Sequence, residues 1–78
     1  MMYISSDGET LVNFDNVSIC YIDDWNAVMV VANGHEYHVE PSFPTTSAAT
    51  EFLAKIAQAE ADGVKVFKAE RKIAEREH

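Results

Sequence analysis

The chain has 78 residues, of which 47% are hydrophobic and 24% are charged, and its formal net charge is −7 at pH 7. These values predict one globular domain over residues 1–78, and no apolar run approaches the roughly 18 residues of a membrane span. The single cysteine, Cys20, excludes an internal disulfide, and the N-terminus lacks the features of a signal peptide, so we expect a cytoplasmic protein.

The charges are segregated along the chain. All six Lys and Arg residues follow position 54, whereas residues 1–54 hold eight carboxylates and no fixed positive charge. The first block therefore has charge −8, and residues 55–78, with five acids and six bases, have charge +1, which together give −7. Such a block projects a negative field that repels phosphate backbones and attracts basic surfaces.

The first forty residues have the pattern of a β-sheet. Expected strands cover residues 2–5, 10–14, 17–22, 25–32 and 35–40. They are separated by turn signals at Asp7-Gly8, Asp15-Asn16, Asp23-Asp24 and Asn33-Gly34. Asn33-Gly34 is the clearest of these and predicts a type I′ hairpin turn, because both residues tolerate positive φ. Pro41 and Pro44 then end the sheet, since neither can donate a backbone hydrogen bond.

An amphipathic helix is expected over residues 47–62. Four apolar residues recur at helical spacing and form one stripe: Phe52, Leu53, Ile56 and Ala59. The N-cap falls on one of three hydroxyl residues, Thr45, Thr46 or Ser47. Gly63 is a natural residue to end the helix.

The C-terminal segment, residues 64–78, fits two patterns. Residues 64–67 alternate like a short strand, whereas Val66, Ala69 and Ile73 fit a helical stripe. A second helix over about residues 66–77 is favoured, because Lys, Glu, Arg and Ala dominate there. The predicted fold is therefore α+β, with an antiparallel sheet of four to five short strands (residues 1–40) packed by one helix and followed by a C-terminal helical extension.

The Asn33-Gly34 turn sets the register of the last hairpin and hence the composition of its two faces. Opposite pairs are then Val30 with Tyr37 and Val28 with Val39, and these four residues form one apolar face for the helix. The second face is half apolar and half acidic and carries Trp25, Ala27, Met29, Val31, Glu36, His38 and Glu40. One helix cannot cover both faces, so the second needs the C-terminal segment, a second subunit of a homodimer or another partner.

No constellation of residues predicts catalysis. Glu36, His38 and Glu40 alternate on one strand and would suit zinc or manganese, but a solvated polar strand face is favoured, so we expect no metal and no cofactor. Cys20 is interpreted as a small buried hydrophobe and Asp23-Asp24 as solvated turn residues. The chain has no phosphate-binding loop and no nucleophile elbow, and we expect no enzyme.

Direct binding to nucleic acid is not expected either, because it relies on clustered Lys and Arg. The expected sheet has no such residue, and the bases of the C-terminal segment are interspersed with Glu70, Glu75 and Glu77. Those bases are Lys65, Lys68, Arg71, Lys72 and Arg76. The segment therefore predicts a mixed, solvated face.

The order of hairpin, strand, Asn-Gly hairpin and helix resembles the small flagellar and swarming motility protein family, a group of very short bacterial and phage proteins. The matching residues are Asp7-Gly8-Glu9 before Leu11-Val12-Asn13, and Asn33-Gly34 before residues 35–39. The resemblance covers about residues 2–60, and residues 41–44 and the C-terminal region depart from it. It implies a tiny cytosolic module without catalysis, of a kind common in phage and mobile elements, and it transfers no functional residue.

Two hypotheses for the function follow from these patterns. In the first, the protein is a phage or mobile-element inhibitor that mimics nucleic acid and occupies a basic, nucleic-acid-binding surface of a host complex. Its contact residues would be Asp7, Glu9, Asp15, Asp23, Asp24, Glu36 and Glu40. In the second, it is a structural adaptor or homo-oligomer that acts through the apolar residues Trp25, Met29 and Val31, and its acidity serves solubility alone.

Overall fold

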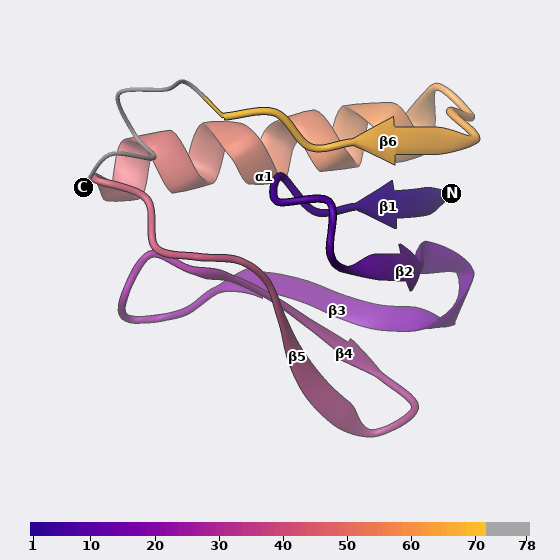
Figure 1. Cartoon of the computed structure of the whole chain (residues 1–78), viewed down its shortest axis with the longest axis horizontal. Coiled ribbons are helices and arrows are strands. Elements are labelled where there is room, and N and C mark those ends of the chain that lie inside the picture. Colours follow the sequence, from indigo (N-terminus) through magenta and orange to yellow (C-terminus); the bar gives the residue numbers. More distant parts are fainter. Residues whose placement is uncertain (72–78) are drawn as a thin grey trace.

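The computed structural model describes residues 1–71, and this part of the chain contains two three-stranded sheets and one α-helix (Figure 1). The elements in chain order are β1 (Met2–Ile4), β2 (Leu11–Asn13), a 3-10 helix (Phe14–Asn16), β3 (Val17–Ile22), β4 (Val28–Ala32), β5 (His35–Glu40), α1 (Thr46–Ala61) and β6 (Val66–Lys68). In Figure 1, α1 and β6 run along the top, β1 and β2 lie in the middle and the second sheet lies below. The α+β class is confirmed, whereas the single sheet is not.

The first sheet has the order β2-β1-β6 and joins strands that are far apart in the chain. β1 pairs antiparallel with β2 and parallel with β6, so that Tyr3 lies beside both Val12 and Phe67. The prediction of a helix from residue 66 is wrong over Val66–Lys68, which form a strand. The alternation of polar and apolar side chains there, and not the helix-favouring composition, matches the structure, and Phe67 packs against the core. Predicted helical residues 72–77 lie outside the described residues.

The second sheet has the order β3-β4-β5, and its last turn was predicted correctly. Asn33 and Gly34 have φ values of 54° and 80°, the positive values that a type I′ turn requires. β4 begins later than expected, at Val28, because the preceding residues form a turn. In that turn, an oxygen of Asp23 accepts hydrogen bonds from the backbone N–H groups of Trp25 and Ala27, both at 2.9 Å.

A β-bulge at the end of β5 changes which side chains face the core. Met29 pairs with His38, but the next pair is Val28 with Glu40, so Val39 is the extra residue. The predicted pairing of Val28 with Val39 is therefore wrong. The extra residue reverses the alternation, and both Val39 and Glu40 become buried.

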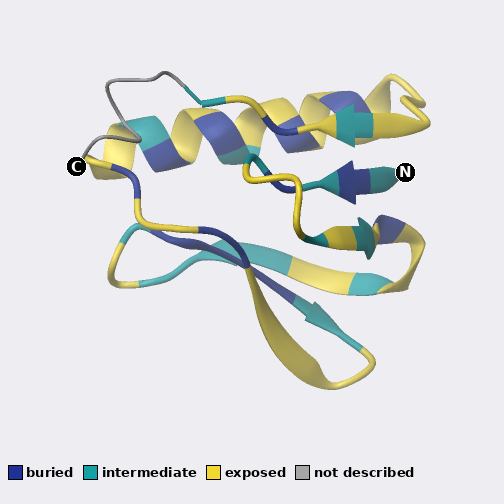
Figure 2. Ribbon diagram, viewed as in Figure 1, coloured by how far each residue is buried: buried dark blue, intermediate teal, exposed yellow. Residues whose placement is uncertain are grey.

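The helix closes the core, and its limits agree with the prediction to within one residue. Thr45 is the N-cap, and its hydroxyl accepts a hydrogen bond from the Ala48 N–H at 3.0 Å. Gly63 follows the helix with a φ of 72°. In Figure 2, buried and exposed segments alternate along α1, as one-sided packing requires. The main cluster of buried core residues comprises Tyr3, Phe14, Val28, Val30, Val39, Phe43, Ala49, Phe52, Ile56 and Ala69.

Among the described residues, no helix is both long enough and apolar enough to cross a membrane.

Candidate functional site

Glu40 is the most deeply buried ionisable side chain of the β5 strand, with 1% of its surface exposed. Its Oε2 atom accepts hydrogen bonds from the Tyr3 hydroxyl at 3.1 Å and from the Ser6 backbone N–H at 2.7 Å, and its Oε1 atom accepts one from the Ser6 hydroxyl at 2.6 Å. Burial, together with the charge of Glu40, raises the pKa of Tyr3. Glu40 was expected on the accessible acidic face, and this placement is wrong because the bulge turns the side chain inward.

Arg71 meets the same carboxylate from the opposite end of the chain. Its Nη1 atom lies 3.6 Å from Oε1 of Glu40, and its side chain is 3% exposed. The two Nη atoms also donate hydrogen bonds to the carbonyls of Pro41 and Ser42, at 2.9 and 3.0 Å, and the guanidinium carbon lies 3.8 Å from the centroid of the Phe43 ring. This cluster ties the β1–β2 hairpin, the end of β5 and the segment after β6 together, which assigns Glu40 a structural role. No local sequence signal marks the bulge, so sequence reasoning missed the cluster.

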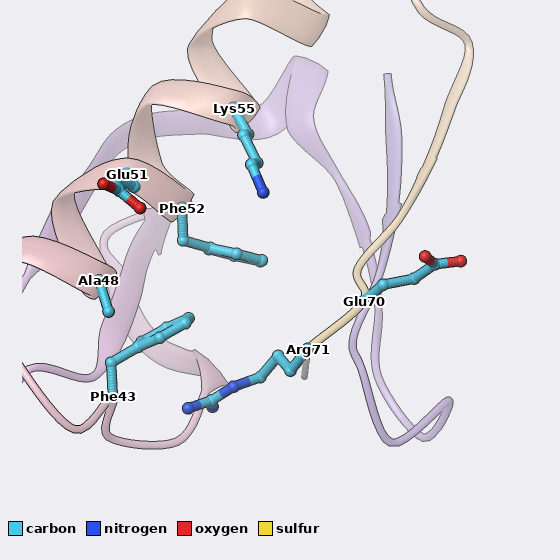
Figure 3. A pocket seen from close by; sticks show the side chains of 7 residues that line it. All are labelled: Phe43, Ala48, Glu51, Phe52, Lys55, Glu70 and Arg71. Atoms are coloured by element: carbon cyan, nitrogen blue, oxygen red, sulfur yellow. The ribbon is translucent and has the colours of Figure 1, made fainter. Parts of the chain in front are cut away.

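A pocket of about 110 Å³ lies beside Arg71 (Figure 3). Its lining residues are Phe43, Ala48, Glu51, Phe52, Lys55, Glu70 and Arg71. In Figure 3 the two aromatic rings lie between the Lys55 and Arg71 side chains, and the Glu70 carboxylate points away from them. The volume is below the roughly 300–1,000 Å³ of most small-molecule sites, so the pocket does not define a ligand class.

The second candidate site is a surface, the outer face of the second sheet. We define this outer face by the residues Ile19, Tyr21, Met29, Val31, Glu36 and His38. Alternation places it, because the intervening residues Cys20, Val28 and Val30 pack into or against the core. The strand registers arrange the face in two rows across β3, β4 and β5. The rows are Ile19–Val31–Glu36 and Tyr21–Met29–His38. Each row is apolar or aromatic over two strands and ends in a polar side chain on β5.

Polar contacts organise the rim of this outer face. Desolvation raises the pKa of Tyr21, and a side-chain hydrogen bond with Glu36 and the negative charge of that residue raise it further. Nε2 of His38 lies 3.7 Å from Oδ2 of Asp23, which occupies the β3–β4 turn. In the same turn Trp25 is 77% exposed. The outer face therefore combines an apolar centre with a rim of carboxylates and a large exposed aromatic ring.

The structure does not bring the seven expected acidic contact residues to one surface. Asp23 and Asp24 lie in the turn next to the outer face, and Glu36 lies on it. Asp7 and Glu9 lie in the β1–β2 loop, where Asp7 accepts a hydrogen bond from the Glu9 N–H at 2.9 Å. Asp15 lies 3.3 Å from the Met1 amino nitrogen. In Figure 1 the β3–β4 turn, the β1–β2 loop and the 3-10 helix occupy the left, the middle and the right of the molecule.

The apolar trio of the second hypothesis is spread over different degrees of exposure. Trp25 is exposed and Val31 is half-buried, whereas Met29 retains only 7% of its surface despite its position on the outer face. The trio thus offers one prominent contact residue, Trp25, with the apolar rows beside it.

The structure also places the residues considered above as metal ligands and as a nucleophile. Glu36 and His38 share the outer face, but Glu40 lies in the core, so the three do not converge. Within residues 1–71 no group of three or more His, Cys, Asp or Glu side chains is arranged to hold a metal ion. Cys20 is half-buried, and burial raises the pKa of its thiol to about 11, which keeps it protonated at neutral pH.

Comparison with known proteins yields no match: no protein-family model, no curated protein and no solved structure matches this chain. The resemblance to small flagellar and swarming motility proteins therefore stays a prediction.

Proposed function

We propose that this protein is a small, non-enzymatic interaction module that binds a basic surface of a partner protein through the outer face and the adjacent β3–β4 turn. One observation carries the proposal: the two apolar rows are bordered by carboxylates on both sides, from Asp23 and Asp24 at the turn and from Glu36 on β5. Apolar area in the centre with charges around it is the usual composition of a protein interface.

The charge of this region supports a basic partner. Residues 17–40, which form the whole second sheet, contain four acids and no Lys or Arg.

The four acids of residues 17–40 differ in their exposure. They are Asp23, Asp24, Glu36 and Glu40. Because Glu40 is buried, three carboxylates remain to border the outer face: Asp23, Asp24 and Glu36. With no base among these residues, the field over the second sheet is negative and would steer a basic partner towards it.

The sharpest form of this proposal is an inhibitor of phage or mobile-element origin that mimics nucleic acid and occupies a basic, nucleic-acid-binding surface of a host complex in the cytoplasm. In this form Asp23, Asp24 and Glu36 take the place of phosphates at the contact. Asp7, Glu9 and Asp15, which lie on other elements, contribute only to the long-range field. Glu40 takes no part, since it is enclosed in the core.

The test is affinity capture from a bacterial lysate on the immobilised protein, eluted with a salt gradient and compared with two double variants. The first carries Asp24→Lys and Glu36→Lys at the outer face. The second carries Glu9→Lys and Glu51→Lys, which make the same change in charge at exposed positions elsewhere. Asp23 is left intact because it holds the β3–β4 turn.

We expect basic, nucleic-acid-binding proteins to be retained by the wild type and the second variant and lost by the first. Added nucleic acid should release the retained proteins, because nucleic acid and the immobilised protein would compete for the same basic surface. Equal loss with both variants would mean that retention depends on net charge alone, and the proposed site would then be wrong.

A second candidate function, a structural adaptor or homo-oligomer acting through the apolar face, is favoured by the 77% exposure of Trp25. A tryptophan so exposed contributes little to the core, but aromatic residues are frequent anchors of interfaces. Light scattering of the wild type and of Trp25→Ala tests this function. Assembly that is lost in the variant supports it, and a wild type that is monomeric at every concentration contradicts it.

A further inference from the structure

The outer edge of β5 is an open strand edge. β5 is the last strand of the order β3-β4-β5, and in the described part of the chain no strand pairs with its other side. Residues 35–38 are all exposed, and Figure 2 shows this end of the β4–β5 hairpin in yellow where it projects from the rest of the molecule. Open edges are commonly blocked by Lys or Pro, but residues 35–38 contain neither.

The hairpin turn determines which backbone groups point out of this edge. The Ala32 carbonyl and the His35 N–H close the two-residue turn, and bonded pairs alternate with non-bonded pairs along an antiparallel ladder. Tyr37 is therefore bonded to β4, whereas the N–H and C=O groups of Glu36 and His38 point outward. The direction of the Val31 carbonyl is consistent with this alternation. It accepts a hydrogen bond from the Ser18 hydroxyl on β3 at 3.2 Å and therefore points away from β5.

The sequence of the edge is complementary to itself in one antiparallel register. A two-fold axis at Tyr37 places the Tyr37 residues of the two copies opposite each other. It also places Glu36 of each copy opposite His38 of the other copy. An imidazole N–H can donate to the carboxylate, and the paired tyrosines add an aromatic contact. An axis at Glu36 would instead oppose two Glu36 side chains, and an axis at His38 would oppose Glu36 and Glu40.

We propose that the β5 edge is a self-association site, at which two copies of this chain pair antiparallel around Tyr37 to form one continuous six-stranded sheet. Glu36 and His38 would exchange four backbone hydrogen bonds across the axis. The bulge at Val39 limits the pairing to this short stretch, so the dimer forms reversibly and its population depends on concentration. The site is the open backbone edge of β5, and it shares the Glu36 and His38 side chains with the outer face that we propose for the basic partner.

Sedimentation equilibrium over a wide concentration range tests the proposal. We expect the wild type to approach twice its monomer mass of 8.7 kDa as the concentration rises. Tyr37→Lys places two like charges opposite each other at the axis and should leave only the monomer. Tyr37 is 51% exposed, so the change should spare the fold, which circular dichroism checks.

Glu51→Lys is the matched control, because it also adds a lysine at an exposed position but lies on α1. Both substitutions reduce the net negative charge, so unspecific repulsion alone would predict more association in both. The proposal predicts loss of the dimer in Tyr37→Lys and its retention in Glu51→Lys. A monomeric wild type, or a dimer that survives Tyr37→Lys, overturns it.

Disulfide cross-linking of single-cysteine variants, made in a Cys20→Ser background, tests the register and does not depend on the lysine variant. Tyr37→Cys should cross-link readily, because directly opposite non-bonded residues have Cα atoms about 4.5 Å apart. Glu36→Cys alone should cross-link poorly, but it should do so when mixed with His38→Cys. If Glu36→Cys alone reacts as fast as Tyr37→Cys, the register is wrong.

Discussion

Replacing Glu40 with glutamine tests whether the buried carboxylate holds the fold together. Glu40→Gln keeps the size of the side chain but removes its charge. An amide oxygen at the Oε2 position can still accept from the Tyr3 hydroxyl and the Ser6 N–H. The amide nitrogen then takes the Oε1 position, 3.6 Å from Nη1 of Arg71, where a donor faces a buried cation in place of an anion.

The size of the expected loss follows from these contacts. Removing one partner of a buried ion pair costs about 3–5 kcal/mol, and the hydrogen bonds retained by the amide place the substitution at the lower end, about 3 kcal/mol. A chain of 78 residues has a total stability of about 4–12 kcal/mol, so the variant would lose a large part of it. The melting temperature should fall by about 12–24 °C.

Urea denaturation followed by far-UV circular dichroism measures this loss through the helix α1. Fluorescence is a poor probe, because Trp25 is already 77% exposed in the folded protein. Glu51→Gln on the exposed face of α1 is the control and should change the free energy of unfolding by no more than about 0.5 kcal/mol. A loss below about 1 kcal/mol in Glu40→Gln would refute the assignment of Glu40 as a structural anchor.

Three further predictions concern other residues. Thr45→Ala removes the N-cap hydroxyl that accepts a hydrogen bond from the Ala48 N–H, and it should lower the free energy of unfolding by about 1 kcal/mol in the same urea assay. Thr45→Ser keeps a hydroxyl and should retain most of the stability of the wild type. Cys20, whose pKa is raised from 9.0 to about 11, should react with a thiol reagent at pH 8 about a hundredfold more slowly than a free cysteine, and an equal rate would contradict its burial. Because the pKa of Tyr3 is raised from 10.0, the stabilising effect of the neutral Tyr3 is complete below pH 10 and is lost at higher pH. In an absorbance titration Tyr3 should ionise only as the protein unfolds. Tyr3→Phe should remove this ionisation step.

The parts of the fold that the sequence predicts are those with local causes. The Asn33-Gly34 turn, the Thr45 cap and the Gly63 end of the helix each depend on the conformational preference of one or two residues, and all three are confirmed. The apolar stripe of the helix is also local, and only Leu53 remains half-buried.

The parts that were predicted wrongly depend on contacts between distant residues. The strand at Val66–Lys68 exists because β1 offers it an edge, as shown by the 2.8 Å hydrogen bond from the Met2 N–H to the Lys65 carbonyl. Glu40 is buried because one extra residue in β5 turns it inward, towards donors on β1 and beyond β6. Neither cause can be read from a window of neighbouring residues, and composition favoured the opposite outcome in both cases.

The parallel pairing of β1 with β6 has a consequence for folding during synthesis. Residues 2–4 leave the ribosome long before their partners at residues 66–68, which are translated 64 positions later, since each pair is separated by 66 minus 2 positions. Until then β1 lacks a neighbour on one side, and Glu40 lacks the cation that Arg71 brings. The helix and the Asn33-Gly34 hairpin can form from local contacts, but the first sheet must wait for the long-range closure, which slows folding. A nascent chain stalled before Val66 should therefore remain sensitive to protease in its first residues while the later hairpin is already protected.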